Sequence, residues 1–360
     1  MSLASVMAAI NKTYGQGTIA MASDAKSINV KRLSTGIFAL DVETGGGLPQ
    51  GRVVSIHGPE SSGKTTLAAK FAGQVQKKPK QNRVAWVDLE GAFDREWFEK
   101  QGMDLDKTIL VQPDAGAKGL DIAEELLRTG ELGMLVVDSV SMVVPDQEIE
   151  ESIEHQGMAL QARLINKFMR KIGMAMQPGD LTGDGNQCIV LLINQERATM
   201  DKYHPITMPG GKGKEYAASI IIGIRRGDWI AEEGDAKKFV GHEIHFKTEK
   251  NKCSPPKKAG VFDFYFSDCD PFKAGAVDNE KSVILYGVEK FIIERAGSIY
   301  KYKNQAFKGK EELLEYFKAH PKEVEELKSR LIDVTPRLSK EVEEKPKAKS
   351  KLKFKMRIKK

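Results

Sequence analysis

One segment of this chain has the G-x-x-x-x-G-K-[ST] spacing of a phosphate-binding loop: Gly58-Pro59-Glu60-Ser61-Ser62-Gly63-Lys64-Thr65. Such a loop turns backbone N–H groups toward a triphosphate, and its two glycines leave room for the turn and for the anion. Lys64 is expected to reach the β- and γ-phosphates, and Thr65 to place its hydroxyl on Mg²⁺. A plain glycine-rich turn is the alternative, but an apolar run before the loop and an amphipathic stretch after it favour a nucleotide site.

Two further apolar runs end in acids that suit the same site. Asp138 follows the run Gly133 to Val137, and a carboxylate there can hold the water shell of a magnesium ion. Glu90 lies just past the run Val84 to Val87, where it could orient or deprotonate the water that attacks a γ-phosphate. Apolar strands often end in acids, so a solvated loop acid is the alternative at each position.

A third apolar run, Cys188 to Ile193, leads to Gln195, whose amide could sense a γ-phosphate. Residues 196–215 follow without hydrophobic periodicity, and a loop of that length inside a compact domain is usually functional. Its basic residues favour a DNA-binding loop over a plain mobile one. They are Arg197, Lys202, Lys212 and Lys214.

The composition of the chain narrows the class of protein. Its 360 residues can bury a full-sized core, and no apolar run approaches the roughly 20 residues that span a bilayer, so no membrane association is expected. The three cysteines form no C-x-x-C pair, so neither a disulfide framework nor a zinc site is expected, and a reducing cytoplasm fits. The net charge of +6 comes from residues 345–360, which hold eight Lys and one Arg with no acid.

Short apolar runs alternate with amphipathic stretches over most of the chain, which predicts a mostly parallel sheet with helices on both faces. The ligand of such a fold lies at the carboxyl ends of the strands, where the phosphate loop and the polar run ends would meet. The predicted strands are Arg52 to His57, Arg83 to Asp88, Thr108 to Val111, Met134 to Asp138, Cys188 to Asn194, Ala218 to Arg225 and His242 to Thr248. The predicted helices are Lys64 to Lys77, Arg95 to Gln101, Gly119 to Arg128 and Met158 to Met176.

Four parts are expected along the chain. Residues 1–31 contain a helical pattern too short to be stable alone, so it must dock on its own core or on a neighbour. Residues 32–267 form the nucleotide-binding core. Residues 268–335 form a small α/β domain that ends in a helical pattern, Glu311 to Leu331. Residues 336–360 form a charged tail without apolar periodicity, which predicts disorder.

Six segments form a combination that points to one protein family. They are Leu33-Ser34-Thr35-Gly36, Gly46-Gly47-Leu48-Pro49-Gln50-Gly51-Arg52, Gly58 to Thr66, Val136-Val137-Asp138-Ser139, Ile193-Asn194-Gln195 and Lys250-Asn251-Lys252. Together they resemble the RecA family of bacterial homologous-recombination proteins, in chromosomal or phage-borne form. The resemblance runs from about Ala9 to Leu331. It implies a RecA-type α/β ATPase core with an N-terminal oligomerisation helix and a small C-terminal α/β domain.

The resemblance implies an ATP- and Mg²⁺-dependent recombinase that forms helical filaments on single-stranded DNA and exchanges strands with double-stranded DNA. Hydrolysis would release the DNA. Glu90 would activate the attacking water and Gln195 would link the γ-phosphate to a DNA loop, while Lys250 and Lys252 would reach the ATP of the adjacent protomer. Asp94 and Trp97 would contact adenine, and Thr65 and, through water, Asp138 would hold the metal. The other implied nucleotide contacts are Gly58, Pro59, Glu60, Ser61, Ser62, Gly63, Lys64 and Thr66.

The resemblance also implies where DNA and a second copy of the chain would bind. One DNA loop would lie near Glu151 to Met158 and another would run from Arg197 to Gly211, while Tyr216 would pack into the neighbouring protomer. The implied primary DNA contacts are Met158, Arg163, Arg170, Arg197, Gly210, Gly211 and Lys212, and the secondary ones are Arg225, Arg226 and Lys247. A single-strand-binding or mediator protein is a further expected partner.

Three features depart from the family pattern. Pro178 to Gln187 is a longer connection, expected to be a surface loop, and the second DNA loop diverges so far that contacts between Ala198 and Met208 do not transfer. The tail is basic where the family's is acidic. Its positive charge favours DNA as the ligand. The apolar residues that alternate with the charges near the end make a protein partner the second interpretation, and an inert solubilising tail is the third.

Two rival functions use the same kind of core. The nearer is a ring-shaped helicase or a repair accessory ATPase, although the accessory type carries a four-cysteine zinc module and a protease-like domain that this sequence lacks. The other is a DNA-coating protein in which ATP binding is only a structural switch. Glu90 argues against it, because a switch without hydrolysis needs no water-activating acid.

Overall fold

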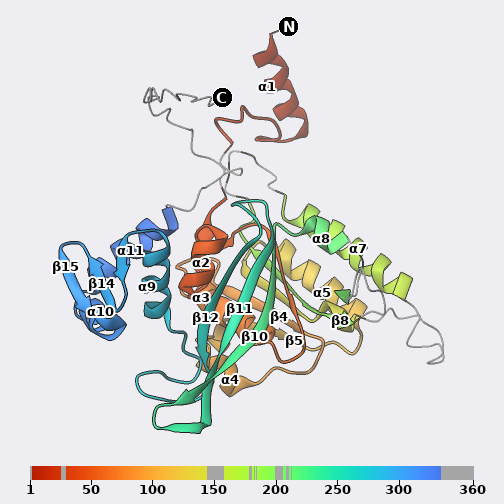
Figure 1. Ribbon diagram of the computed structural model, residues 1–360. Coiled ribbons are helices and arrows are strands. Elements are labelled where there is room, and N and C mark those ends of the chain that lie inside the picture. Colours follow the sequence, from red (N-terminus) through yellow and green to blue (C-terminus); the bar gives the residue numbers. More distant parts are fainter. Residues whose placement is uncertain are drawn as a thin grey trace, which may run out of the picture.

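A twisted eight-stranded sheet lies at the centre of the protein, in a computed structural model that describes residues 2–25, 30–143, 158–177, 181, 183, 185–198, 206–207, 211 and 213–333. The strand order is β12-β11-β10-β3-β7-β6-β4-β5, with helices on both faces (Figure 1). The six strands from β10 to β5 pair in parallel, whereas β11 and β12 add an antiparallel edge. The predicted fold class is confirmed.

The strands of this sheet are β3 (Val53–Gly58), β4 (Arg83–Asp88), β5 (Thr108–Val111), β6 (Leu132–Asp138), β7 (Ile189–Gln195), β10 (Ile220–Glu232), β11 (Asp235–Asn251) and β12 (Lys258–Tyr265). The helices before and around it are α1 (Leu3–Tyr14), α2 (Phe38–Thr44), α3 (Lys64–Gln76), α4 (Arg95–Lys100), α5 (Gly116–Arg128), α7 (Met158–Ala175) and α8 (Gly213–Ala217). Four short strands pair outside it: β1 (Arg32–Leu33) with β2 (Leu48–Pro49), and β8 (Arg197–Ala198) with β9 (Ile206–Thr207).

The C-terminal part contains a small antiparallel sheet and three helices. Its elements are α9 (Asn279–Glu289), β13 (Ile293–Ala296), β14 (Ile299–Tyr302), β15 (Gln305–Lys308), α10 (Gly309–Ala319) and α11 (Pro321–Asp333). This part packs on α2, where the rings of Phe38 and Tyr286 meet edge to face with centroids 6.2 Å apart. Asn279 also accepts a hydrogen bond of 2.8 Å from the Phe38 backbone N–H.

Strand β4 shows why the sheet is covered on both faces. Its side chains point alternately to the two sides, so Val84 and Trp86 belong to one buried apolar cluster, and Ala85 and Val87 to the other. The first cluster includes residues of α2, α3, α4 and α9, and the second includes residues of α5 and α7. A strand that is apolar on both faces is stable only between two layers, which fixes the sandwich around the parallel strands.

A buried aspartate explains one segment of the family resemblance. Asp41 of α2 accepts hydrogen bonds from the Ser34 hydroxyl and, at 2.8 Å and 2.7 Å, from the Thr35 N–H and hydroxyl. Burial raises the pKa of Asp41 to about 6, although these hydrogen bonds oppose the shift. Ser34 and Thr35 therefore fix the start of α2 rather than contact a ligand.

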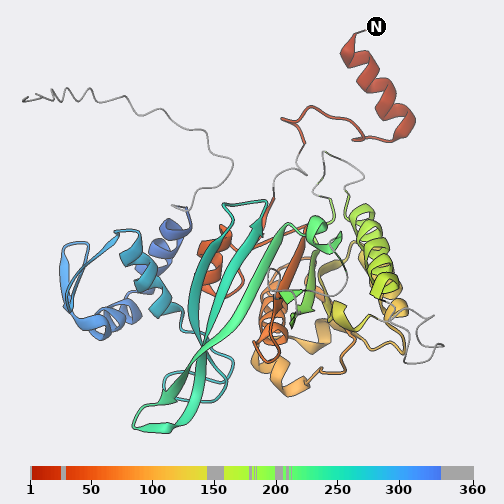
Figure 2. The ribbon, with the colours of Figure 1, turned by 45° about the vertical axis from the view of Figure 1, so that its right-hand side comes forward.

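Helix α1 extends away from the rest of the described chain (Figures 1 and 2). None of its residues is buried, and Leu3 is 73% exposed. Ser2 caps the helix by accepting a hydrogen bond from the Ser5 N–H at 3.2 Å. The predicted N-terminal helix is present, and the partner that covers its apolar residues stays a prediction.

Several elements differ from their predicted form. The helical pattern Glu311 to Leu331 divides into α10 and α11 at Pro321, because proline has no N–H to continue the first helix. Strands β10 and β11 form a hairpin longer than the apolar runs indicate, and α2 and β12 have no predicted counterpart. In the part of the chain that the structure describes, no helix is long and apolar enough to cross a membrane.

Candidate nucleotide site and nucleic-acid interface

The phosphate loop joins the end of β3 to the start of α3, at the carboxyl edge of the parallel strands. Gly63 has a φ of 93° and Ser61 a φ of 56°, so the loop passes twice through the left-handed region. A Cβ on Gly58 would lie 2.3 Å from the Ile224 carbonyl oxygen, so no larger residue fits there. The backbone thus forms the compact cradle that a phosphate requires, as the sequence predicts.

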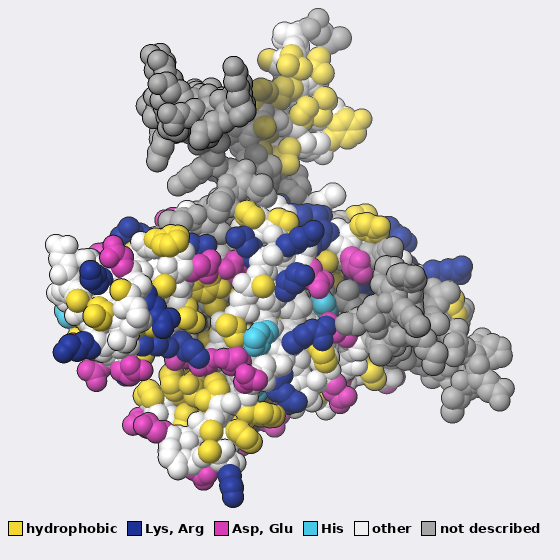
Figure 3. All heavy atoms as spheres, viewed as in Figure 1, with side chains coloured by type: hydrophobic (Ala, Val, Ile, Leu, Met, Phe, Trp, Pro, Cys, Tyr) yellow, Lys and Arg dark blue, Asp and Glu magenta, His cyan; other side chains and the backbone are white. Residues whose placement is uncertain are grey.

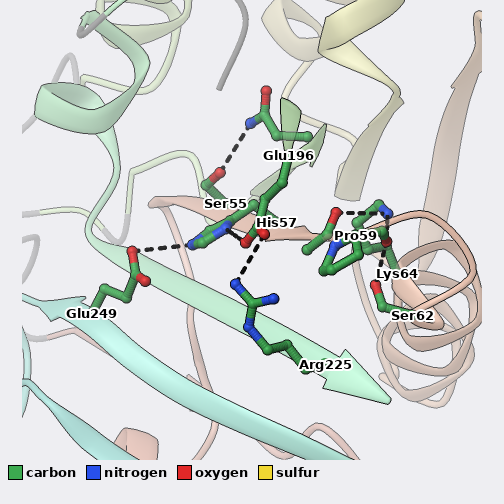
Figure 4. Close-up of polar contacts among 10 residues, drawn as sticks. Ser55, His57, Pro59, Ser62, Lys64, Glu196, Arg225 and Glu249 are labelled. Carbon is green, nitrogen blue, oxygen red and sulfur yellow. Dashed lines mark hydrogen bonds and ion pairs between the residues drawn. The ribbon is translucent and has the colours of Figure 1, made fainter. Parts of the chain in front are cut away.

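Lys64 lies within this cradle (Figure 4). Its Nζ donates hydrogen bonds to the carbonyl oxygens of Gly58, at 3.1 Å, and Pro59, at 2.7 Å. Burial lowers the pKa of Lys64, against the opposing charges of Glu90 and Asp138. No carboxylate of the described residues forms an ion pair with this buried ammonium, so a phosphate would supply its negative partner.

Thr65 and Asp138 form the part of the site that suits a metal ion. The Thr65 hydroxyl donates a hydrogen bond of 2.9 Å to Oδ2 of Asp138. The other oxygen, Oδ1, is buried and has no hydrogen-bond partner among the described residues. Burial raises the pKa of Asp138 to about 7, and the charges of Glu90 and Asp88 add to the shift. A buried carboxylate with one oxygen free of hydrogen bonds from the described residues, beside a hydroxyl, fits a hydrated Mg²⁺ ion, whose charge would favour the ionised form.

Glu90 and Gln195 face each other above the loop. Gln195 Nε2 donates a hydrogen bond of 2.9 Å to Oε1 of Glu90, and the Ser139 hydroxyl donates to the same oxygen. A cavity of about 250 Å³ connects them with the phosphate loop. Its lining residues are Glu60, Ser61, Ser62, Gly63, Lys64, Thr65, Thr66, Glu90, Asp138 and Gln195.

Asp94 and Trp97 lie at the start of α4 and are not among the residues that line this cavity. Asp94 is the N-cap of the helix and accepts a hydrogen bond of 2.9 Å from the Trp97 N–H. The indole Nε1 of Trp97 donates a hydrogen bond of 3.2 Å to the hydroxyl of Thr66 on α3. The half-buried indole is therefore tied to the helix that follows the phosphate loop, which suits a base-contacting position.

Lys250 and Lys252 lie away from this cavity. Lys250 pairs with Ile221, which pairs with Ser55 of β3, so the two lysines lie toward the start of β3 and the phosphate loop at its end. Both Nζ atoms donate to the Tyr216 carbonyl oxygen at 3.2 Å, and Lys250 also donates to that of Glu215. The lysines thus hold the C-terminal end of α8, where carbonyl groups attract cations.

Helices α7 and α8 bring several predicted DNA-binding residues together. Arg163 and Arg170 are exposed on α7, seven residues apart and so on one face of the helix. Gly211 lies next to α7, because a Cβ there would be 3.3 Å from that of Ala162. The Tyr216 side chain is 72% exposed on α8.

The predicted secondary DNA site lies on the β10–β11 hairpin. Arg225, Arg226 and Lys247 are all exposed there, and Figure 3 shows Lys and Arg side chains gathered on the face where these strands lie. Arg225 is engaged in an ion pair of 3.0 Å with Glu196, and the Arg226 guanidinium lies 4.7 Å from the centre of the Trp229 ring. Arg225 therefore has a structural partner that its sequence pattern did not reveal.

Some predicted residues lie outside the described part. Gly210, Lys212, the first loop up to residue 157 and the tail 336–360 are not described. Met158 begins α7 and Arg197 lies in β8. Sequence reasoning also missed residues near the site, namely Ser139 as a partner of Glu90, and His57, Glu196 and Glu249. The only available signal was adjacency, since His57 precedes Gly58 and Glu196 follows Gln195.

A phosphate loop at the end of a central parallel strand, with one acid just after β4 and one at the end of β6, defines an α/β nucleotide-binding protein of the phosphate-loop class. Comparison with known proteins gives the family. The model of the RecA N-terminal domain matches residues 1–269. RecA of Rickettsia massiliae is 35% identical over 324 residues, which cover 89% of each chain. RecA of Clostridium acetobutylicum is 36% identical over 301 residues, 82% of this chain and 80% of the relative.

The chain therefore belongs to the RecA family. Membership supports a role in DNA recombination and repair, with binding of ATP and DNA.

Proposed function

We propose that this protein is a DNA-dependent ATPase that assembles as a helical filament on single-stranded DNA and catalyses homologous pairing and strand exchange with a duplex. The observation that carries the proposal is the hydrogen bond between Glu90 and Gln195 above the phosphate loop. It joins a water-activating acid to the residue from which the predicted DNA loop starts. The proposed chain has four parts: an N-terminal docking segment (residues 1–31), an ATPase and DNA-binding core (32–267), a small C-terminal domain (268–335) and a basic tail (336–360).

ATP and Mg²⁺ are the proposed cofactors. Backbone N–H groups of the loop from Gly58 to Thr66 would hold the phosphates, and Lys64 would neutralise their charge. Thr65 and, through water, Asp138 would hold the ion, which supplies charge neutralisation of the phosphate oxygens. Asp94 and Trp97 would contact adenine.

Hydrolysis is assigned to Glu90. Its Oε1 already accepts hydrogen bonds from Gln195 and Ser139, so the carboxylate is held in one orientation at the rim of the cavity. A water on the same side could donate its proton to this group. Removal of such a base is expected to lower turnover without removing the nucleotide contacts.

The site would be completed by a second copy of the chain. Lys250 and Lys252 lie toward the start of β3, whereas the phosphate loop of their own protomer follows its end, which supports action on a neighbour's nucleotide. The exposed apolar residues of α1 and the exposed Tyr216 are surfaces for such a contact. Repetition of one such heterologous contact generates a helix when it does not close into a ring.

DNA would bind at two surfaces, with Arg163, Arg170 and the segment from Arg197 to Lys212 on one and Arg225, Arg226 and Lys247 on the other. Electron microscopy with ATP and single-stranded DNA tests the assembly. Helical filaments support the proposal, and closed rings support the helicase alternative. A DNA-coating protein is distinguished by its lack of DNA-stimulated ATP hydrolysis.

A further inference from the structure

A buried histidine joins the phosphate loop to two other strands of the site (Figure 4). The His57 side chain, only 6% exposed, directly precedes Gly58 on β3. Its Nδ1 lies 2.9 Å from Oε1 of Glu196, and its Nε2 lies 3.1 Å from Oε2 of Glu249. The contact with Glu196 is a hydrogen bond, whereas the contact with Glu249 is an ion pair without hydrogen-bond geometry. The imidazole thus lies between a carboxylate just after β7 and one on β11.

The contact with Glu249 crosses an intervening strand, and two features of the backbone make room for it. Strand β10 lies between β3 and β11. Glu249 is skipped in the β10–β11 register, so it is the extra residue of a β-bulge, a feature that re-aims side chains. Gly223 of β10 lies under the contact, since a Cβ there would be 3.1 Å from Cε1 of His57 and 3.4 Å from Oε1 of Glu249.

The contact with Glu196 ties the start of the predicted DNA loop to the phosphate loop. The Glu196 N–H donates a hydrogen bond of 3.2 Å to the Gly58 carbonyl oxygen, which also accepts from Lys64. The Glu196 carboxylate, 8% exposed, binds His57 with one oxygen and Arg225 with the other. A movement of Gln195 that shifted Glu196 would therefore disturb the contacts of the buried Glu196 carboxylate with His57 and Arg225.

The protonation state of the His57 ring decides how strongly it interacts with the carboxylates of Glu196 and Glu249. A neutral imidazole has one N–H donor, whereas the imidazolium has two and carries the opposite charge. Burial lowers the pKa of His57, but the contacts with Glu249 and Glu196 outweigh burial and raise it. The charged groups around the cluster are Glu196, Glu249, Arg225, Lys247 and Lys64.

We propose that His57 is a positioning residue, which as an imidazolium holds Glu196 and Glu249 and so couples the phosphate loop to Gln195, the DNA loop and the strand of Lys250. The inference rests on the proposed function, because it assigns a regulator to the same ATPase. The coupling is complete at low pH, where the ring is charged, and is lost as pH rises through the folded-state pKa of His57, above its ordinary value.

The test measures ATP hydrolysis with and without single-stranded DNA from about pH 6 to pH 9, together with an NMR titration of the His57 ring. The variants are His57→Gln and Glu249→Gln. His320→Gln is the matched control, since His320 lies in the C-terminal part and its side chain contacts the Tyr316 carbonyl oxygen and ring. The quantity compared is the ratio of the DNA-stimulated rate to the DNA-free rate.

We expect the ratio in the unmodified protein and in His320→Gln to fall as pH passes the NMR midpoint of His57. His57→Gln should lower the ratio about tenfold at the acid end and abolish its pH dependence, because it removes one charge-assisted hydrogen bond, to Glu196, and one ion pair, with Glu249. Glu249→Gln should move both midpoints to lower pH, because it removes a carboxylate that stabilises the charged ring. This variant keeps the test valid if His57→Gln does not fold, since Glu249 is 45% exposed.

Two outcomes overturn the inference. One is an unchanged ratio and pH profile in a folded His57→Gln protein. The other is a Glu249→Gln protein in which the NMR midpoint moves while the midpoint of the ratio stays in place. If the unmodified protein shows no DNA stimulation at any pH, the proposed function itself fails, so the two failures are distinguishable.

Discussion

Gln195 donates a hydrogen bond of 2.9 Å to Glu90, a residue 105 positions earlier in the chain. The two side chains come from the ends of β7 and β4, and they meet over the end of β6, which lies between those strands. Ser139, just after β6, binds the same Glu90 oxygen. Three strands thus converge on one carboxylate, and a γ-phosphate that drew Gln195 toward itself would free part of that carboxylate for a water molecule.

Glu90→Gln should slow DNA-stimulated ATP hydrolysis at least about 100-fold, because a general base of this kind contributes that factor. The amide can still bond Gln195 and Ser139, so ATP and DNA binding should persist and filaments should become longer-lived. Steady-state hydrolysis and electron microscopy measure the two effects. Glu131→Gln, which alters an acid exposed on the surface, is the control. Hydrolysis at the unmodified rate in Glu90→Gln would show that another group activates the water.

Lys64→Ala and Lys250→Ala should each lose DNA-stimulated ATP hydrolysis for a different reason. A mixture of the two proteins should recover part of that activity. Lys64→Ala removes the cation of the phosphate loop, so nucleotide-dependent filaments should be lost. Lys250→Ala should still fold and bind nucleotide, yet lose DNA-stimulated turnover, and Lys252→Ala should behave in the same way. In a mixed filament a Lys250→Ala phosphate loop can meet an intact lysine from a Lys64→Ala neighbour. Mixed filaments of proven composition without any recovered activity would argue against a shared site.

Asp41→Asn should reveal how much the burial of an ionised carboxylate beside Ser34 and Thr35 lowers the free energy of unfolding. The folded-state pKa of Asp41 is about 6 and the ordinary value is 3.8, so the unfolded chain loses this proton first and folding stability falls between those values. Asparagine retains an acceptor for both Thr35 donors. We expect Asp41→Asn to be more stable than the unmodified protein at pH 8, by roughly 1 to 3 kcal/mol. Urea unfolding at pH 8 and pH 4 measures this gain, which should disappear at pH 4; a gain independent of pH would contradict it.

The sequence could predict that the proposed nucleotide-site residues lie close together, because these residues follow apolar runs. Strands β4 and β5 have the predicted bounds, and in a parallel sheet their carboxyl ends share one edge. Glu90, Asp138 and Gln195 could therefore be expected near the phosphate loop, and the structure places all three around one cavity. The lengths of apolar runs and their alternation with amphipathic stretches are local signals, and here they were sufficient to place the strand ends.

The histidine cluster could not be predicted in the same way. His57 meets Glu196, 139 residues later in the chain, through the pairing of β3 with β7, and meets Glu249 only through a bulge and a glycine. A bulge shifts the register by one residue without any mark in the hydrophobic pattern. The ion pair of Arg225 with Glu196 was hidden for the same reason, so a residue assigned to DNA contact also has a partner within the fold.

Deletion of residues 345–360 should weaken DNA binding, because it removes nine positive charges that attract phosphates. Each single-strand phosphate neutralised by the tail contributes roughly −0.7 to the slope of log affinity against log salt, so the truncated protein should show a shallower slope. ATP binding without DNA should be unchanged. A full-length variant with Leu352, Phe354, Met356 and Ile358 changed to Ser keeps the charge and is the matched control, and it should retain the steep slope. An unchanged slope after truncation would exclude DNA as the ligand of the tail, and loss of a protein partner in the serine variant would then identify the apolar residues as its recognition element.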